Sequence, residues 1–247
     1  IAGSAECRDG RAACLMDRVS STVILGDEPL TIDQVVAVAR SVPPGSDYLG
    51  EPIHVEVSEA AWGRVRHTRS VVEGLADDTV AHYGISTGFG ALATMHIPVE
   101  KRHQLQRSLI RSHAAGAGPE VEREVVRALM LLRIQTLATG RTGIREETLR
   151  AYVAMLNAGI TPVVHEYGSL GCSGDLAPLA HCALALMGEG TVRDAAGDLR
   201  SAAEALAAAG IEPVVLEEKE GLALINGTDG MLGMLLLALD DLGTLLD

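Results

Sequence analysis

The feature that most constrains this chain is a glycine-rich run that ends directly before an apolar helical pattern. Residues 168–181 read Gly-Ser-Leu-Gly-Cys-Ser-Gly-Asp-Leu-Ala-Pro-Leu-Ala-His. Glycine adopts backbone conformations that a β-carbon forbids, so the run predicts a tight loop. In such a loop the amide nitrogen of Gly174 can approach the carbonyl carbon of Cys172, as an internal cyclisation requires. Loss of water from the ring and from Ser173 would then leave an electrophilic methylidene-imidazolone.

The rest of the chain reads mainly as helix. Of its residues 47% are hydrophobic but only 2% aromatic, so the core must consist of Ala, Leu and Val, which suits close-packed helices. Apolar residues recur at three- and four-residue intervals behind Ser, Thr and Asp at N-cap positions. We expect helices at 31–39, 58–72, 99–113, 121–138, 147–156, 175–187, 201–209 and 217–246, the last interrupted near 226–227, and extended pieces at 54–57 and 161–164.

Charge and cysteine usage argue against several classes of partner. A net charge of −13 disfavours nucleic acid and anionic membranes as partners. The four cysteines, at 7, 14, 172 and 182, have no metal-ligand spacing, and their sparse use fits a reducing cytosol. The longest apolar run, Met231–Leu239, is far shorter than the roughly 20 residues of a membrane span. We therefore expect a cytoplasmic protein without a metal site, a signal peptide or a membrane segment.

Three further motifs stand in or beside the expected helices. Residues 83–90, Tyr-Gly-Ile-Ser-Thr-Gly-Phe-Gly, are spaced like a phosphate-binding loop, but no lysine follows, and a loop with a buried Tyr and Phe is the simpler interpretation. Residues 111–116, Arg-Ser-His-Ala-Ala-Gly, place His113 near a helix end, where histidine usually caps the helix or is solvated. Residues 224–229, Leu-Ile-Asn-Gly-Thr-Asp, contain the Asn-Gly pair of a common turn.

Together the four motifs resemble those of the aromatic amino acid ammonia-lyases, from about Val23 to the last residue. That family forms its prosthetic group from an Ala-Ser-Gly triplet, and here Cys172 replaces the alanine, of which only backbone atoms enter the ring. The resemblance implies a 4-methylidene-imidazol-5-one made from Cys172, Ser173 and Gly174, with no external cofactor. It also implies a mainly α fold, namely the N-terminal part of the lyase fold, with helices around a glycine-rich loop site and the start of a long-helix bundle.

The resemblance further implies roles for three side chains. Tyr83 matches the family's catalytic base, a role for which a phenol of ordinary pKa about 10 needs a positive field or hydrogen-bond donors nearby. His113 stands where the family reads the substrate ring, and Ser-His is the pattern of its histidine-specific members, among which the actinobacterial ones are most similar. A site made for an imidazole rejects a phenyl ring, because its own polar groups would stay unpaired. Asn226 lines the site, whereas Asp229 replaces the usual Gln and receives no role.

The implied activity is a carbon–nitrogen lyase reaction that converts L-histidine to trans-urocanate and ammonia, the first step of histidine degradation. Family members are homotetramers with longer chains, so we expect 21–247 to be the N-terminal portion of a lyase, truncated within a helix, and 1–20 to be a disordered extension or an expression remnant. Two alternatives stay open. One is a tyrosine or phenylalanine ammonia-lyase or an aminomutase, and the other is an inactive helical fragment that associates with itself or with a complementary chain.

Two nucleophilic interpretations of the glycine-rich run are weaker. A nucleophile elbow reads Gly-x-Ser-x-Gly, and Gly171–Asp175 lacks the last glycine. A Cys172–His181 pair is conceivable as a nucleophile and base. Nine residues of helix would separate the two side chains by more than two turns, which is too far for direct contact.

Overall fold

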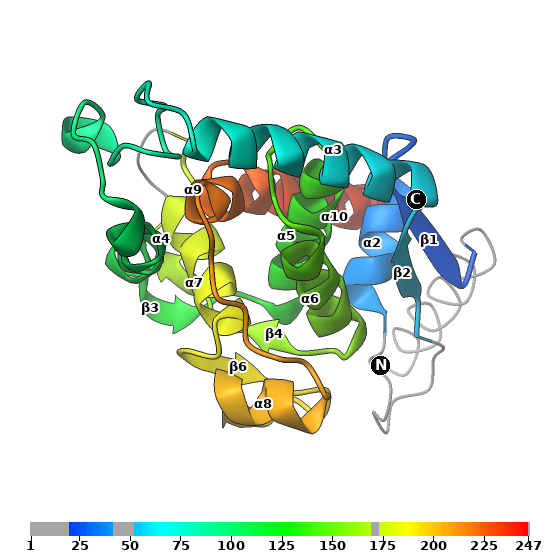
Figure 1. The fold of residues 1–247 in the computed structure, drawn as a ribbon. Coiled ribbons are helices and arrows are strands. Elements are labelled where there is room, and N and C mark those ends of the chain that lie inside the picture. The colour runs from blue at the N-terminus through cyan, green and yellow to red at the C-terminus, as the bar shows by residue number, and fades with distance from the viewer. Residues whose placement is uncertain (1–19, 42–51, 169–172, 247) are drawn as a thin grey trace.

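The computed structural model describes residues 20–41, 52–168 and 173–246, and within them the protein is a body of packed helices with small sheets at its edges (Figure 1). The predicted mainly α fold is therefore confirmed. The helices are α2 (Ile32–Arg40), α3 (Glu59–Ala76), α4 (Val99–His113), α5 (Arg123–Ala138), α6 (Glu146–Asn157), α7 (Leu176–Leu186), α8 (Ala202–Ala208), α9 (Glu220–Ile225) and α10 (Asp229–Leu246), with a short 3-10 helix, η1, at Gly90–Leu92. The predicted extension 1–20 and Cys172 fall outside the described residues, apart from Ser20.

The strands form three small sheets. Strands β1 (Thr22–Leu25) and β2 (His54–Val57) pair in parallel, β3 (Ala117–Glu120) pairs antiparallel with β5 (His165–Tyr167), and β4 (Thr161–Pro162), β6 (Thr191–Arg193) and β7 (Leu199–Ser201) follow one another antiparallel. The predicted piece at 54–57 is β2. The piece predicted at 161–164 shortens to the two residues of β4. The other five strands were not predicted from the sequence.

Helix starts follow the capping residues. Thr31 forms a complete capping box with Gln34 at the start of α2, and the Ser58 hydroxyl accepts the amide of Ala61 at the start of α3. Both caps satisfy amide groups that have no partner inside the helix. Asp175 directly precedes α7, as expected, and the break predicted near 226–227 separates α9 from α10.

Helix α5 forms the centre of the core and contacts α2, α6 and α10. Its side chains Leu129, Leu131 and Ile134 are fully buried. Arg127 is buried among them, where it donates to the carbonyl oxygens of Val38 and Leu156, near the ends of α2 and α6. A cation at helix C-termini is favourable. Burial, together with the charge of Arg123, lowers the pKa of Arg127 to about 9.

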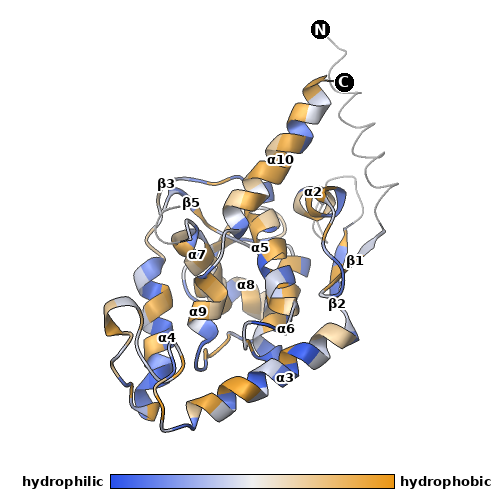
Figure 2. Ribbon diagram, turned by 90° about the horizontal axis from the view of Figure 1, so that it is seen from above, coloured by the Kyte–Doolittle hydropathy of each residue, from blue (hydrophilic) through white to orange (hydrophobic). Residues whose placement is uncertain are grey.

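Helix α10 starts inside the body and then extends away from it (Figure 2). Near its outer end Arg40, from α2, donates to Asp240 and Asp241 at 2.6 and 2.7 Å. By length and composition alone, Glu220–Leu246 passes the test for a membrane span, as apolar core helices also do. The packing of α10 on α5 and the break before it fit the core-helix interpretation, although several leucines of α10 stay exposed.

Candidate functional site

The described part of the predicted ring triplet fits a cyclised backbone. Gly174 has a φ of +93°, a conformation that residues with a β-carbon rarely adopt. The hydroxyl of Ser173 is buried and has no hydrogen-bond partner among the residues that the structure describes. A buried, unpartnered hydroxyl is costly, and its loss as water would remove that cost. The triplet therefore suits a methylidene-imidazolone at both residues that the structure describes.

Asp175 fixes the end of this loop to α10. The side chain is fully buried, and its Oδ2 accepts the amide of Met231 at 3.0 Å. Ala177, Pro178 and Leu179, in the first turn of α7, are buried as well. The positive N-terminal end of α7 thus begins directly after the triplet, where it favours negative charge.

The β3–β5 pair connects His113 to the glycine-rich loop. Strand β3 begins four residues after His113, and β5 ends one residue before Gly168. Ala117 and Tyr167 are partners in this pair. A β-carbon at Gly168 would lie 3.2 Å from the Cα of Gly116 and 3.1 Å from the β-carbon of Ala177, so these backbones approach more closely than larger residues allow.

The ring of His113 is oriented by its own helix. Its Nδ1 lies 2.9 Å from the carbonyl oxygen of Leu109 and 3.0 Å from the Ser112 hydroxyl. A carbonyl oxygen only accepts, so Nδ1 carries the proton in the neutral ring and Nε2 offers a lone pair. The natural partner for such an acceptor is an N–H or O–H donor.

His181 holds the turn that follows His113. Its Nε2 accepts the amide of Gly116 at 3.1 Å, and its ring meets that of His165 edge-on, with centroids 5.6 Å apart. Burial, together with His165, lowers the pKa of His181. Since Nε2 is already occupied, His181 has a clear structural task, and the Cys172–His181 interpretation gains no support from the described residues.

Asn226 ends α9 and is exposed. Its backbone amide donates to Leu222 at 3.1 Å, while its side chain makes no hydrogen bond with the residues described. Beyond it, Asp229 forms a buried ion pair with Arg133 of α5. Asp229 has no predicted role, and Arg133 lies outside the four sequence motifs. A lone arginine in an apolar helical run was the available signal, because buried charges are normally paired.

Tyr83 lies on the connection between α3 and α4, which extends beyond the helical body at the left of Figure 1. The predicted burial is wrong for Tyr83, which is 52% exposed, whereas Phe89 is half-buried. Their rings meet at right angles, 6.2 Å between centroids. The tyrosine oxygen accepts the amide of Gly90 at 3.5 Å. A β-carbon at Gly84 would lie 3.1 Å from Leu222, so the connection reaches α9.

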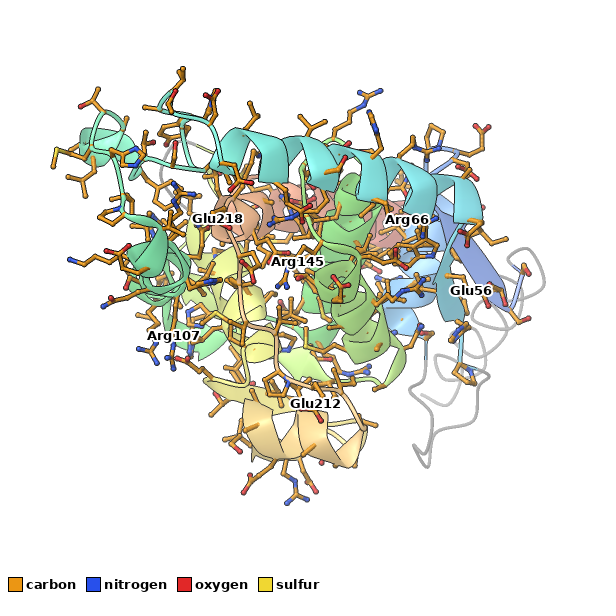
Figure 3. The ribbon with its side chains drawn as sticks, viewed as in Figure 1. Glu56, Arg66, Arg107, Arg145, Glu212 and Glu218 are labelled. Carbon is orange, nitrogen blue, oxygen red and sulfur yellow. The ribbon has the colours of Figure 1, made fainter. Side chains whose placement is uncertain are left out.

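The structure therefore brings the motifs together unevenly. His113, Ser173 and Gly174 are joined through the β3–β5 pair and the start of α7, and residues 226–229 reach the same place through α10. Within the residues described, Tyr83 makes no hydrogen bond or ring contact with these groups; its ring contacts Phe89 and its oxygen the Gly90 amide. Arg107 of α4 is labelled in Figure 3. Its side chain forms an ion pair with Glu189 at 2.8 Å.

One cleft lies away from the predicted site residues, and the described ranges contain no group of metal-binding side chains. A cleft of about 650 Å³ is lined by residues 26–30, by α5 side chains and by Asp229, and includes none of the predicted site residues. Among residues 20–41, 52–168 and 173–246, no three His, Cys, Asp or Glu side chains are grouped to hold a metal ion. The described cysteine, Cys182, is free and buried.

Known proteins resemble this chain in sequence and in fold. The chain is 59% identical over 224 residues to the histidine ammonia-lyase of Streptomyces coelicolor. The match covers 91% of this chain and 42% of that protein. It matches the crystal structure of histidine ammonia-lyase from Trypanosoma cruzi at 36% identity and a TM-score of 0.76, over 88% of this chain and 40% of that one. The crystal structure of tyrosine aminomutase from Streptomyces globisporus matches at 38% identity and a TM-score of 0.77. That match covers 87% of this chain and 38% of that one.

The chain thus spans about two fifths of the length of the curated relatives it matches. The family description of the aromatic amino acid lyases matches residues 30–247, which is most of the chain. It includes all four motifs, together with the helices that hold them. The fold, the motifs and the matched length agree, and the chain belongs to the aromatic amino acid lyase family.

Proposed function

We propose that this chain is the part of a histidine ammonia-lyase that carries the electrophile, and that the protein converts L-histidine to trans-urocanate and ammonia. One observation carries the proposal: the buried, unpartnered Ser173 hydroxyl beside Gly174 at positive φ, within the triplet of a lyase family. The similarity to curated histidine ammonia-lyases supports the choice of substrate.

The proposed prosthetic group is a 4-methylidene-imidazol-5-one from Cys172, Ser173 and Gly174, without an external cofactor or metal. It supplies an electrophile, which none of the ordinary side chains provides. The chain's own residues hold it: Asp175 fixes the end of the loop to α10, and the N-terminal end of α7 favours negative charge nearby.

His113 is proposed to bind the substrate ring. With Nδ1 donating to Leu109, its Nε2 accepts the N–H of an imidazole, whereas a phenyl ring offers no donor. Tyr83 is the proposed base for the β-proton, and Gly90 already donates to its oxygen. Tyr83 is exposed, and no described contact joins it to Ser173. The role therefore requires a contact between Tyr83 and the substrate that is not among those the structure describes.

The proposed assembly is a homo-oligomer, a tetramer by the family resemblance, in the cytoplasm. The exposed leucines of α10 support association, because exposed apolar patches usually mark contact surfaces. They also favour the second candidate, an inactive helical unit that associates with a complementary chain. The solved structures include aminomutases, so an aromatic aminomutase, or a tyrosine or phenylalanine ammonia-lyase, is the other alternative.

The substrate proposal is tested by His113→Leu. Losing a hydrogen-bonding partner of the imidazole should lower kcat/KM for L-histidine by at least about 100-fold, since sites built for polar groups discriminate strongly. Urocanate formation is followed by its absorbance, with L-phenylalanine and L-tyrosine as competing substrates. His67→Leu, on the outer face of α3, is a control that should leave turnover unchanged. Equal turnover by His113→Leu and the parent would refute the ring-binding role, and no turnover by the folded parent would favour the inactive alternative.

A further inference from the structure

The connection between α9 and α10, residues 226–228, is held from behind by a buried guanidinium. Arg133 lies on α5, and its side chain is only 1% exposed. Its Nη1 donates to the carbonyl oxygen of Ala223, in α9, at 3.2 Å. Its Nη2 donates to the carboxylate of Asp229, the first residue of α10. One planar group therefore holds both ends of the connection.

The backbone of the connection also packs directly on this group. A β-carbon at Gly227 would lie 2.8 Å from Cζ of Arg133, so a larger residue would displace the guanidinium. The hydroxyl of Thr136, one turn further along α5, lies 3.0 Å from the carbonyl oxygen of Leu132 and 3.4 Å from Oδ1 of Asp229. Gly227 and Asp229 are therefore both packed against side chains of α5.

The first turn of α10 relates this pair to the glycine-rich loop. The amide of Met231 donates to Asp175, which directly follows Gly174. A β-carbon at Gly230 would lie 3.3 Å from both carboxylate oxygens of Asp175, so the two segments are in close contact. The position of residues 226–228 relative to Gly174 is therefore set by Arg133 on one side and by Asp175 on the other.

A buried ion pair is a weak source of stability, because desolvation of both charges offsets their attraction. Here burial raises the pKa of the Asp229 carboxyl even though Arg133 acts in the opposite direction. What the arginine adds beyond charge is its rigid fork, with donors that reach two acceptors at once. A lysine at the same position pairs with one acceptor as a single point charge.

We propose that Arg133 is a positioning residue that fixes Asn226 at the site by bridging Ala223 and Asp229. The Asn226 side chain has no hydrogen bond of its own among the described residues, so its location follows that of the backbone that carries it. The conformational part of this inference is independent of the reaction, and only its consequence for turnover rests on the proposed function.

The test is Arg133→Lys, read by hydrogen exchange of the Asn226 amide, which donates to the carbonyl oxygen of Leu222 at 3.1 Å. The variant keeps the positive charge beside Asp229 but loses the bridge, so exchange should rise by about tenfold or more, as expected when a segment opens locally. Arg127→Lys is the matched control, since Arg127 is also buried on α5 and also donates to main-chain carbonyls, but of Val38 and Leu156. Unchanged exchange of the Asn226 amide in Arg133→Lys, or an equal rise in both variants, would overturn the proposal.

Two further measurements keep the result unambiguous. If Arg133→Lys does not fold, Asp229→Asn removes the charge at nearly constant size, and it should raise exchange of the same Asn226 amide. In protein that turns over L-histidine, Arg133→Lys should lower kcat/KM by about tenfold while leaving the fraction of chains with a dehydrated triplet unchanged. Absence of the dehydrated triplet in the parent would refute the proposed function, and the exchange result would still decide the role of Arg133.

Discussion

The hydrogen bond from the Gly116 amide to Nε2 of His181 requires a neutral histidine, because a protonated Nε2 has no lone pair. The folded protein therefore disfavours protonation, and burial lowers the pKa of His181 below its ordinary value near 6.5. An unfolded chain takes up a proton there more readily. The contribution of His181 to stability is thus complete above about pH 6.5 and is lost as the pH falls toward the folded-state pKa.

The resulting prediction compares the parent with His181→Gln, whose side-chain carbonyl can still accept the Gly116 amide without titrating. Urea unfolding at pH 7.5 and pH 5.5 should show a smaller loss of stability for the variant than for the parent. The carboxylates whose pKa is lowered by arginine partners, such as Glu189 beside Arg111, respond at more acidic pH and affect both proteins alike. An equal loss in both proteins would show that the histidine contributes nothing in this range.

At the scale of elements, the helices follow from local signals and the small sheets do not. Val99–His113 has the predicted limits, because an apolar stripe at helical spacing and the following Ala-Ala-Gly are both local. Strands β3 and β5 are four and three residues long, and each exists only because the other lies beside it. Their pairing spans some fifty residues of chain and left no period-two pattern to read. The pairing of Arg133 with Asp229 was not predicted either, because the two residues are 96 positions apart in the sequence.

The capping boxes provide a prediction at this scale. Thr31→Ala removes the side-chain acceptor for the Gln34 amide at the start of α2 and should lower the free energy of unfolding by about 1 kcal/mol. Thr31→Ser keeps the acceptor and should stay close to the parent. Ser201→Ala, at the equivalent box of α8, should have a similar cost. Denaturant unfolding measures all three, and equal stability of the Ala and Ser variants at position 31 would contradict the assignment.

The outward part of α10 presents an exposed apolar surface. Leu235, Leu239 and Leu242 are each about half exposed, and Figure 2 shows this helix extending beyond the packed body. Arg40 holds it to α2 through Asp240 and Asp241, which keeps its direction fixed. An apolar helix held away from the body is suited to packing against other helices.

We therefore expect the chain to associate in a concentration-dependent way through α10. Leu239→Glu should shift the association equilibrium toward monomer by at least about tenfold, because it places a charge within an apolar contact. Leu199→Glu is the matched control, since Leu199 is equally exposed but lies on β7. Sedimentation velocity over a range of concentrations distinguishes them. Equal behaviour of the two variants would place the contact elsewhere.

The mass of the peptide that contains residues 172–174 reports whether the triplet has cyclised. We expect this peptide to be lighter by two waters, one lost in closing the ring and one from Ser173. Gly174→Ala, which strains the positive φ, should abolish the loss, while Gly197→Ala has the same strain at +90° with open space around it and should retain the loss. A folded parent chain whose peptide keeps its full, unmodified mass would contradict the account.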